Sequence, residues 1–295
     1  EIEERDWSSD VCSSDLLYMR KRHTVALIYD FDGTLSPGNM QEFGFIQAIG
    51  KDPETFWRKS AELSQSQDAS EILSYMKLML DEAKASNIQI RREDFKKFGS
   101  KIPLYDGVKE WFSMVNRYGE TKGVNIEHYI NSSGLQEMIE GSIIYHEFKK
   151  VFACSFLYEN GVATWPAVAI DYTGKTQFIF KINKGVHSIR DHVRVNEYVP
   201  DKDRAVPFSN MIYFGDGATD IPCMKLVKQF GGHSIAVYDP SKRNARVKAE
   251  KLISENRVNF ACPTDYTRYG KLYRVVTSII DKIVADLQLD AITKV

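Results

Sequence analysis

The sequence predicts an α/β protein built on a Rossmann-like parallel sheet, with a block of helices inserted after the first strand. Two observations predict this class. Short apolar runs alternate with segments of helical periodicity, as in strands joined by crossover helices. In addition, a long helical stretch follows the first apolar run, so the helical block is an insertion rather than a terminal extension.

The elements follow in order. "TVALIYDF" (24–31) is the first expected strand, and residues 53–87 carry apolar side chains at helical spacing. A turn and an amphipathic helix follow over 104–120, and "NIEHYINSSG" is the second strand. Residues 151–174 are typical of a hairpin turning at 159–161. We expect a helix to begin in "INKGVHSIRDHV", then strand–loop–helix over 210–227, a strand over 233–240 and a helix over 276–288.

The expected domains follow from these elements. Residues 19–35 and 106–295 should form the core, and residues 36–105 a helical cap. Residues 6–16, "DWSSDVCSSDL", can be written letter for letter as the translation of a common sequencing-library adapter. We therefore interpret residues 1–18 as an adapter-derived artefact, with Met19 as the natural start. A polar, serine-rich leader is the alternative.

Composition limits the function. The chain has 295 residues, 43% of them hydrophobic, and a formal net charge of −1. This near-neutral balance favours neither a nucleic-acid nor a membrane-surface partner. The four cysteines, Cys12, Cys154, Cys223 and Cys262, lack the spacing of a zinc or disulfide framework. We interpret them as reduced thiols of a cytoplasmic protein.

Two acidic clusters carry the chemistry. Asp30 and Asp32 lie one residue apart in "LIYDFDGTLSP", so on a strand they share one side. "FGDGATD" places Asp216 and Asp220 just after the apolar run "MIYF". Because ligands of parallel sheets bind at the carboxyl ends of the strands, both clusters should meet in one crevice near Ser132. Separate solvated turn aspartates are the alternative.

Four carboxylates in one crevice would repel one another unless a cation neutralises them. Oxygen ligands with retained waters and substrate phosphate suit Mg²⁺. The sequence therefore predicts a magnesium site at these strand ends.

The order of "DFDGTL", "INSSG", "INKG" and "GDGATD" resembles the four motifs of the haloacid dehalogenase-like hydrolase superfamily, from Asp30 to Asp220. The inserted helices and the hairpin are similar to those of its phosphoserine phosphatase-like branch. This resemblance implies the roles of nucleophile for Asp30, general acid and base for Asp32, and magnesium binding by Asp30, the Asp32 backbone carbonyl and Asp216. It also implies that Asp220 orients the catalytic lysine or metal-bound water.

The resemblance further implies that Ser132, Ser133 and Gly134 bind phosphate and that Lys184 offsets charge on the nucleophile and phosphoryl group. Ser133 competes with Ser132 for the main phosphate contact, and Lys181 competes with Lys184. The implied function is a Mg²⁺-dependent phosphatase that acts on a small phosphorylated metabolite through an aspartyl phosphate. A phosphotransferase or phosphomutase of the same fold and a non-catalytic binding protein are the alternatives.

Overall fold

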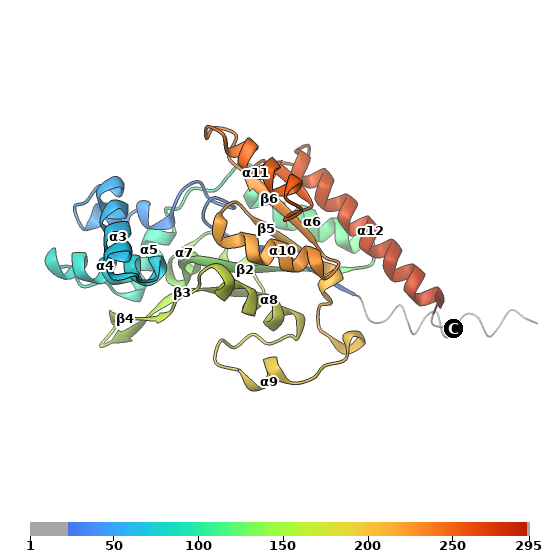
Figure 1. Ribbon diagram of the computed structural model, residues 1–295, viewed down its shortest axis with the longest axis horizontal. Coiled ribbons are helices and arrows are strands. Elements are labelled where there is room, and N and C mark those ends of the chain that lie inside the picture. Colours follow the sequence, from blue (N-terminus) through green and yellow to red (C-terminus); the bar gives the residue numbers. More distant parts are fainter. Residues whose placement is uncertain (1–22, 294–295) are drawn as a thin grey trace, which may run out of the picture.

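The structure, a computed structural model, describes residues 23–293, so the expected artefact at residues 1–18 lies outside the described residues. Its centre is a seven-stranded sheet with the strand order β4-β3-β2-β1-β5-β6-β7 (Figure 1). The strands are β1 (Thr24–Tyr29), β2 (Asn125–Leu135), β3 (Lys150–Glu159), β4 (Val162–Val168), β5 (Met211–Gly215), β6 (His233–Tyr238) and β7 (Phe260–Pro263). All neighbouring pairs are parallel except β3 and β4, which form the expected antiparallel hairpin. The predicted fold class is confirmed.

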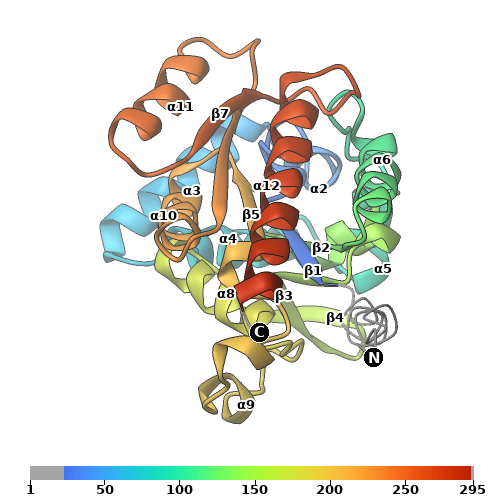
Figure 2. The same ribbon diagram turned by 90° about the vertical axis from the view of Figure 1, so that its right-hand side faces the viewer.

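Helices cover the sheet and form a group at one end of it. The helices of four or more residues are α2 (Phe45–Ala48), α3 (Pro53–Gln67), α4 (Glu71–Ala85), α5 (Arg92–Gly99), α6 (Val108–Thr121), α7 (Gln136–Gly141), α8 (Thr176–Asn183), α9 (Val193–Asn196), α10 (Ile221–Gln229), α11 (Ala245–Ser254) and α12 (Lys271–Thr293), together with the 3₁₀ turn η3 (Tyr172–Lys175). Helices α6 and α12 lie on one side of the sheet, and α8 and α10 on the other (Figure 2). None of the helices within residues 23–293 is both long and apolar enough to cross a membrane.

The central strand β1 explains where a site can form. It is flanked by β2 on one side and β5 on the other, so the chain reverses its direction of travel across the sheet there. Such a switch point opens a crevice at the carboxyl ends of the strands. All residues of β1 after Thr24 are buried, because helices cover both faces of a parallel sheet.

The inserted helices α3, α4 and α5 gather at one end of the molecule, beyond the carboxyl end of β1 (Figure 1). Aromatic side chains of α3 and α5 pack against Phe45 of α2: the Phe45 ring centroid lies 6.4 Å from that of Phe56 and 6.0 Å from that of Phe95. The hairpin contributes to this group, since the Ala163 N–H donates to the Ile90 carbonyl at 2.9 Å. The helical block is therefore supported by β4 as well as by its own core.

One expected element is wrong. The helix predicted to begin near Lys184 ends there instead: α8 spans Thr176–Asn183, and Gly185 follows with φ +67°. This left-handed conformation, which glycine adopts readily, terminates helices. The apolar residues Phe178, Ile179 and Ile182 supply the buried face of the helix that precedes it. Helix α11 and strand β7 are additional elements that the sequence patterns above do not predict.

Helices α5 and α7 pack backbone to backbone through a pair of glycines. A Cβ added to Gly99 would lie 1.9 Å from the Met138 carbonyl oxygen, and one added to Gly141 would lie 2.0 Å from the Lys96 carbonyl oxygen. Backbone atoms cannot move aside as the end of a side chain can. Small residues are therefore required where the helical block meets the core.

We expect Gly99→Ala to lower the free energy of unfolding by roughly 1–3 kcal/mol, the usual cost of overpacking. The better helix propensity of alanine opposes this loss by at most about 1 kcal/mol, so the steric term decides the sign. Urea unfolding followed by circular dichroism measures the change. The exposed neighbour gives the control, Ser100→Ala, which should change stability little. A Gly99→Ala protein as stable as the parent would contradict this packing.

Candidate active site

The first two residues of the site, Asp30 and Asp32, directly follow the carboxyl end of β1. The Asp30 side chain is 5% exposed, and its Oδ1 accepts the Phe31 N–H at 2.7 Å. Asp32 is half-buried, and its Oδ1 accepts the Met40 N–H at 3.0 Å. The turn between β1 and the helical block thus fixes both carboxylates by backbone donors.

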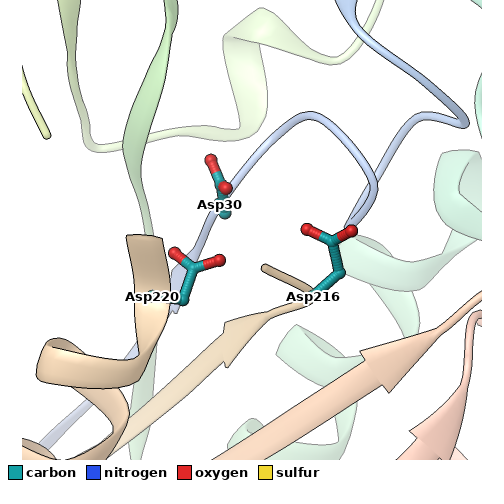
Figure 3. A group of neighbouring side chains, drawn as sticks. All are labelled: Asp30, Asp216 and Asp220. Carbon is teal, nitrogen blue, oxygen red and sulfur yellow. The ribbon is translucent and has the colours of Figure 1, made fainter. Parts of the chain in front are cut away.

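The carboxylates of Asp30, Asp216 and Asp220 converge as predicted (Figure 3). Each offers an oxygen, and these oxygens all lie within 4.8 Å of one another. Asp216 follows β5 and Asp220 stands at the beginning of α10. The site also depends on Gly33, which has φ +72° and whose added Cβ would lie 2.1 Å from Asp216 Oδ2. A side chain at this position would fill the place of the Asp216 carboxylate.

A buried lysine joins two of these carboxylates. Lys175 Nζ lies 2.7 Å from Asp220 Oδ1 and 3.1 Å from Asp30 Oδ2, and the lysine side chain is fully buried. Asp220 also accepts the Tyr213 hydroxyl at 2.9 Å and the Gly217 N–H at 3.3 Å. The Lys175 backbone is held by the Asn131 side-chain amide, which donates to its carbonyl at 3.0 Å.

The structure places neither sequence candidate for the lysine in this cluster. Lys184 Nζ donates to the carbonyls of Val195, at 2.7 Å, and Glu197. Lys181 Nζ donates to the carbonyls of Ser188 and Asp191 at 3.0 and 2.8 Å. Lys181 lies in the last turn of α8 and Lys184 is its C-cap residue, and both side chains hold the loop that follows the helix. The expected position of Lys184 is therefore wrong, and Lys175, which sequence reasoning missed, occupies that place.

Burial and mutual repulsion shift the acid–base properties of the cluster. Burial, together with the charges of Asp220 and Asp30, raises the pKa of Asp216 to about 8. Burial and the Asp30 charge raise the pKa of Asp220 to about 6, while Lys175 counteracts both. Burial alone would lower the pKa of Lys175, but Asp220 and Asp30 raise it above its ordinary value. The ammonium therefore stays charged.

Asp32 has an environment that favours its protonated form. Burial raises its pKa well above the ordinary value, and the charges of Asp30, Asp216 and Glu42 add to the effect. The Met40 N–H opposes the shift by stabilising the carboxylate. A carboxyl group that keeps its proton at neutral pH can act as a general acid.

The end of β2 supplies hydroxyl and backbone groups beside the carboxylates. Ser132 Oγ accepts the Gly134 N–H at 3.1 Å, whereas the buried Ser133 Oγ has no hydrogen-bond partner among the described residues. The Ser133 carbonyl accepts the Tyr75 hydroxyl at 2.8 Å and the Cys154 thiol at 3.3 Å. Helix α4 of the inserted block thus contacts the loop that sequence analysis assigns to phosphate.

These groups line one cleft of about 300 Å³. Its lining residues are Asp30, Asp32, Gly33, Gly38, Asn39, Gln41, Trp57, Ile72, Tyr75, Ser132, Ser133, Gly134, Asp216, Thr219 and Lys242. Lys175 and Asp220 lie behind this surface. The cleft combines a carboxylate cluster, the segment 132–134 at the end of β2 (the serine loop) and side chains from the inserted helices.

The residues present fit a divalent cation. Hard carboxylate oxygens are the ligands that Mg²⁺ prefers, and Gly33 leaves the room that the Asp216 carboxylate needs. Burial and the charges of Asp220 and Asp30 raise the pKa of Asp216, and a cation would offset those charges. Because Asp220 is engaged by Lys175, Tyr213 and Gly217, Asp30 and Asp216 have more freedom to bind a metal.

Comparison with known proteins identifies a family and a relative. Residues 27–225 match the family model described as haloacid dehalogenase-like hydrolase. An uncharacterized protein of Borreliella burgdorferi is 32% identical over 281 residues, covering 86% of this chain and 95% of that protein.

Two solved structures share the fold. A substrate-bound phosphoserine phosphatase complex has a TM-score of 0.53 at 15% identity, covering 88% of this chain and 99% of the other. A probable phosphoserine phosphatase from Vibrio cholerae has a TM-score of 0.55 at 13% identity, covering 92% and 67%. Similarity at these identities concerns the fold, whereas the family match covers the carboxylates and Lys175. The chain belongs to the haloacid dehalogenase-like hydrolases.

Proposed function

We propose that this hydrolase is a Mg²⁺-dependent phosphatase that cleaves a small phosphate monoester through an aspartyl phosphate on Asp30. One observation carries the proposal: the Asp30 carboxylate, paired with the Lys175 ammonium, stands in the same cleft as Asp32, Asp216 and the serine loop. A nucleophile, a second carboxyl group and cationic groups are the components that phosphoryl transfer requires.

Asp30 and Asp32 divide the reaction. An Asp30 carboxylate oxygen attacks the phosphorus, the bond from phosphorus to the ester oxygen breaks, and the protonated Asp32 gives its proton to the departing alkoxide. Asp32, now ionised, takes a proton from water, whose oxygen attacks the phosphorus of the aspartyl phosphate. Phosphate leaves and the Asp30 carboxylate returns. The raised pKa of Asp32 supports the first half of this cycle.

The remaining groups position the phosphate and balance its charge. Phosphate oxygens would lie beside the hydroxyl groups of Ser132 and Ser133 and beside the backbone at Gly134. Lys175 takes the role that the family motifs imply for a lysine, because its ammonium holds Asp30 and offsets its charge. Asp220 fixes that ammonium, as expected for an orienting residue.

Asp30, Asp216 and the backbone carbonyl of Asp32 would hold the magnesium ion. When bound, it neutralises charge on the phosphoryl oxygens. Residues 36–105 would act as a cap that shields the reaction from water, since Trp57 and Tyr75 of α3 and α4 already line the cleft.

The lysine assignment is tested by comparing two substitutions. Lys175→Met should lower the rate of p-nitrophenyl phosphate hydrolysis by at least about 10²-fold, because it removes an electrostatic contact at the reacting centre. Lys184→Met, a matched change nine residues later, should retain most of the parent rate. Steady-state kinetics measures both, and circular dichroism shows whether each protein is folded. The opposite order of effects would return the role to Lys184.

The metal site is tested without relying on activity. Mg²⁺ should raise the melting temperature of the parent protein, because a ligand that binds the folded state stabilises it. Asp216→Asn should abolish this rise, since the substitution removes one of the proposed ligands. Thermal unfolding with and without Mg²⁺ measures the effect, with the exposed Asp286→Asn as control. An unchanged rise in Asp216→Asn would place the metal elsewhere.

The two carboxylates are distinguished by the leaving group. Asp30→Asn should form no phosphoenzyme. Asp32→Asn should slow alkyl phosphates by about 10²- to 10⁴-fold, the usual contribution of a positioned acid. Nitrophenolate leaves without that proton, so this variant should show a burst of nitrophenolate and gain the mass of a phosphoryl group. Rapid-quench kinetics and mass spectrometry provide the measurements.

Two results would sink these assignments. The first is the same covalent intermediate in Asp30→Asn. The second is equal slowing of aryl and alkyl substrates in Asp32→Asn with no intermediate. Release of inorganic phosphate in the absence of an added acceptor separates the phosphatase from the phosphotransferase and phosphomutase alternatives.

A further inference from the structure

One part of the cleft lining has a composition of its own. Its residues come from the turn after β1 and from helices α3 and α4: Gly38, Asn39, Gln41, Trp57, Ile72 and Tyr75. This leaving-group wall contains two amides, a phenol, an indole and an aliphatic side chain. None of these six residues carries a formal charge, so the part of a substrate beyond the phosphate meets neither an ammonium nor a carboxylate there.

The nearest charges do not alter this conclusion. Lys242 lines the cleft, but its charge lowers the pKa of Asp216 and so acts at the carboxylate end. Glu42 is not among the residues that line the cleft. Its Oε1 accepts the side-chain N–H groups of Asn39 at 2.9 Å and Trp57 at 2.8 Å. These two cleft-lining residues therefore use their polar groups to satisfy Glu42 and present the remainder of their side chains to the cleft.

Gln41 is the exception within the wall. Its side chain is 2% exposed, and its Oε1 is buried without a hydrogen-bond partner among the described residues. The Tyr75 hydroxyl, by contrast, donates to the Ser133 carbonyl at 2.8 Å. A buried amide oxygen without a partner costs free energy that a ligand can recover. An amide can both donate to and accept from a hydroxyl group.

We infer that the substrate is the monoester of a small, uncharged, hydroxylated alcohol, such as a polyol or sugar, and that Gln41 recognises one of its hydroxyl groups. This inference rests on the proposed phosphatase function. The Trp57 and Tyr75 rings, whose centroids lie 5.9 Å apart, offer apolar surface to the carbon skeleton. A cleft of about 300 Å³ stands at the lower end of ligand pockets, which favours a small leaving group.

The experiment compares kcat/KM for substrates that differ in one feature. Glycerol phosphate and n-propyl phosphate differ in hydroxyl groups. Glucose 6-phosphate and 6-phosphogluconate differ in a carboxylate. O-phosphoserine and O-phosphoethanolamine, which carry an ammonium group, are compared with glycerol phosphate. We expect the hydroxylated, uncharged member of each comparison to be preferred, with glycerol phosphate favoured over n-propyl phosphate by about tenfold, the value of a hydrogen bond that leaves a buried group unpaired when lost.

Gln41→Met keeps the length of the side chain and removes its hydrogen-bonding groups. It should reduce the preference for glycerol phosphate over n-propyl phosphate to about onefold. A merely structural effect, for example through the neighbouring Met40 N–H and Asp32, would slow both substrates alike and leave their ratio unchanged. Gln67→Met, at the exposed end of α3, is the matched control and should keep the parent ratio. Thermal unfolding establishes that both variants are folded.

Each outcome has one meaning. A preference for the carboxylate- or ammonium-bearing substrates, or an unchanged ratio in Gln41→Met, would overturn the inference while the phosphatase function stands. Failure of the parent protein to hydrolyse any of these esters or p-nitrophenyl phosphate would overturn the function itself, and the inference with it.

Discussion

The buried ammonium of Lys175 is the interaction on which the rest of the site depends. Removing an ammonium from water costs several kcal/mol, and close carboxylates offset that cost when their geometry is good. Asp220 and Asp30 supply them at 2.7 and 3.1 Å. Four separate segments must therefore meet: the end of β1, η3, β5 through Tyr213, and the beginning of α10. The positions of the Asp30 and Asp220 carboxylates follow from this requirement.

The sequence predicted the parts of this arrangement that depend on strand ends. Asp30, Asp216 and Asp220 each follow an apolar run, and a parallel sheet brings such ends together regardless of the distance between them along the chain. The predicted hairpin, the amphipathic helix α6 and the parallel core follow from periodicity in the same way. Local patterns are sufficient here because each element buries the face that its own residues define.

Lys175 escaped prediction because no local pattern distinguishes it. It stands in η3, just before α8, and nothing in "DYTGKTQF" announces a fully buried lysine. The sequence predicted a helix that begins near Lys184. The apolar residues before Gly185 are equally compatible with a helix that ends there, as α8 does. A better signal was available: Gly185 favours a helix end, which moves the helix start back to Lys175-Thr176. Long-range pairing with Asp30 and Asp220 settles the choice, and only three-dimensional structure contains it.

The leaving-group wall shows a second limit of sequence reasoning. Periodicity predicts that one face of α3 and of α4 is buried, but it does not say which residues turn toward the core and which toward the carboxylates. Phe56 is buried within the aromatic cluster of the block, whereas its neighbour Trp57 lines the cleft. The distinction depends on how α3 and α4 pack in the folded protein, which the period of the sequence does not contain.

Without a cation, the mutual repulsion of the carboxylates also opposes folding. The buried Lys175 ammonium reduces this repulsion. Raised pKa values of Asp216, to about 8, and Asp220, to about 6, mean that the folded state without a cation binds protons more tightly than the unfolded chain. Stability from this source is therefore lost as pH rises from the ordinary range of an aspartate toward 8. Lys175 limits the loss through permanent charge, whereas Asp216 faces the open cleft and remains available to a cation. The cluster therefore has two parts. Asp30 and Asp220 are paired with Lys175, which stabilises the folded protein, whereas Asp216 lines the cleft and can still bind a cation.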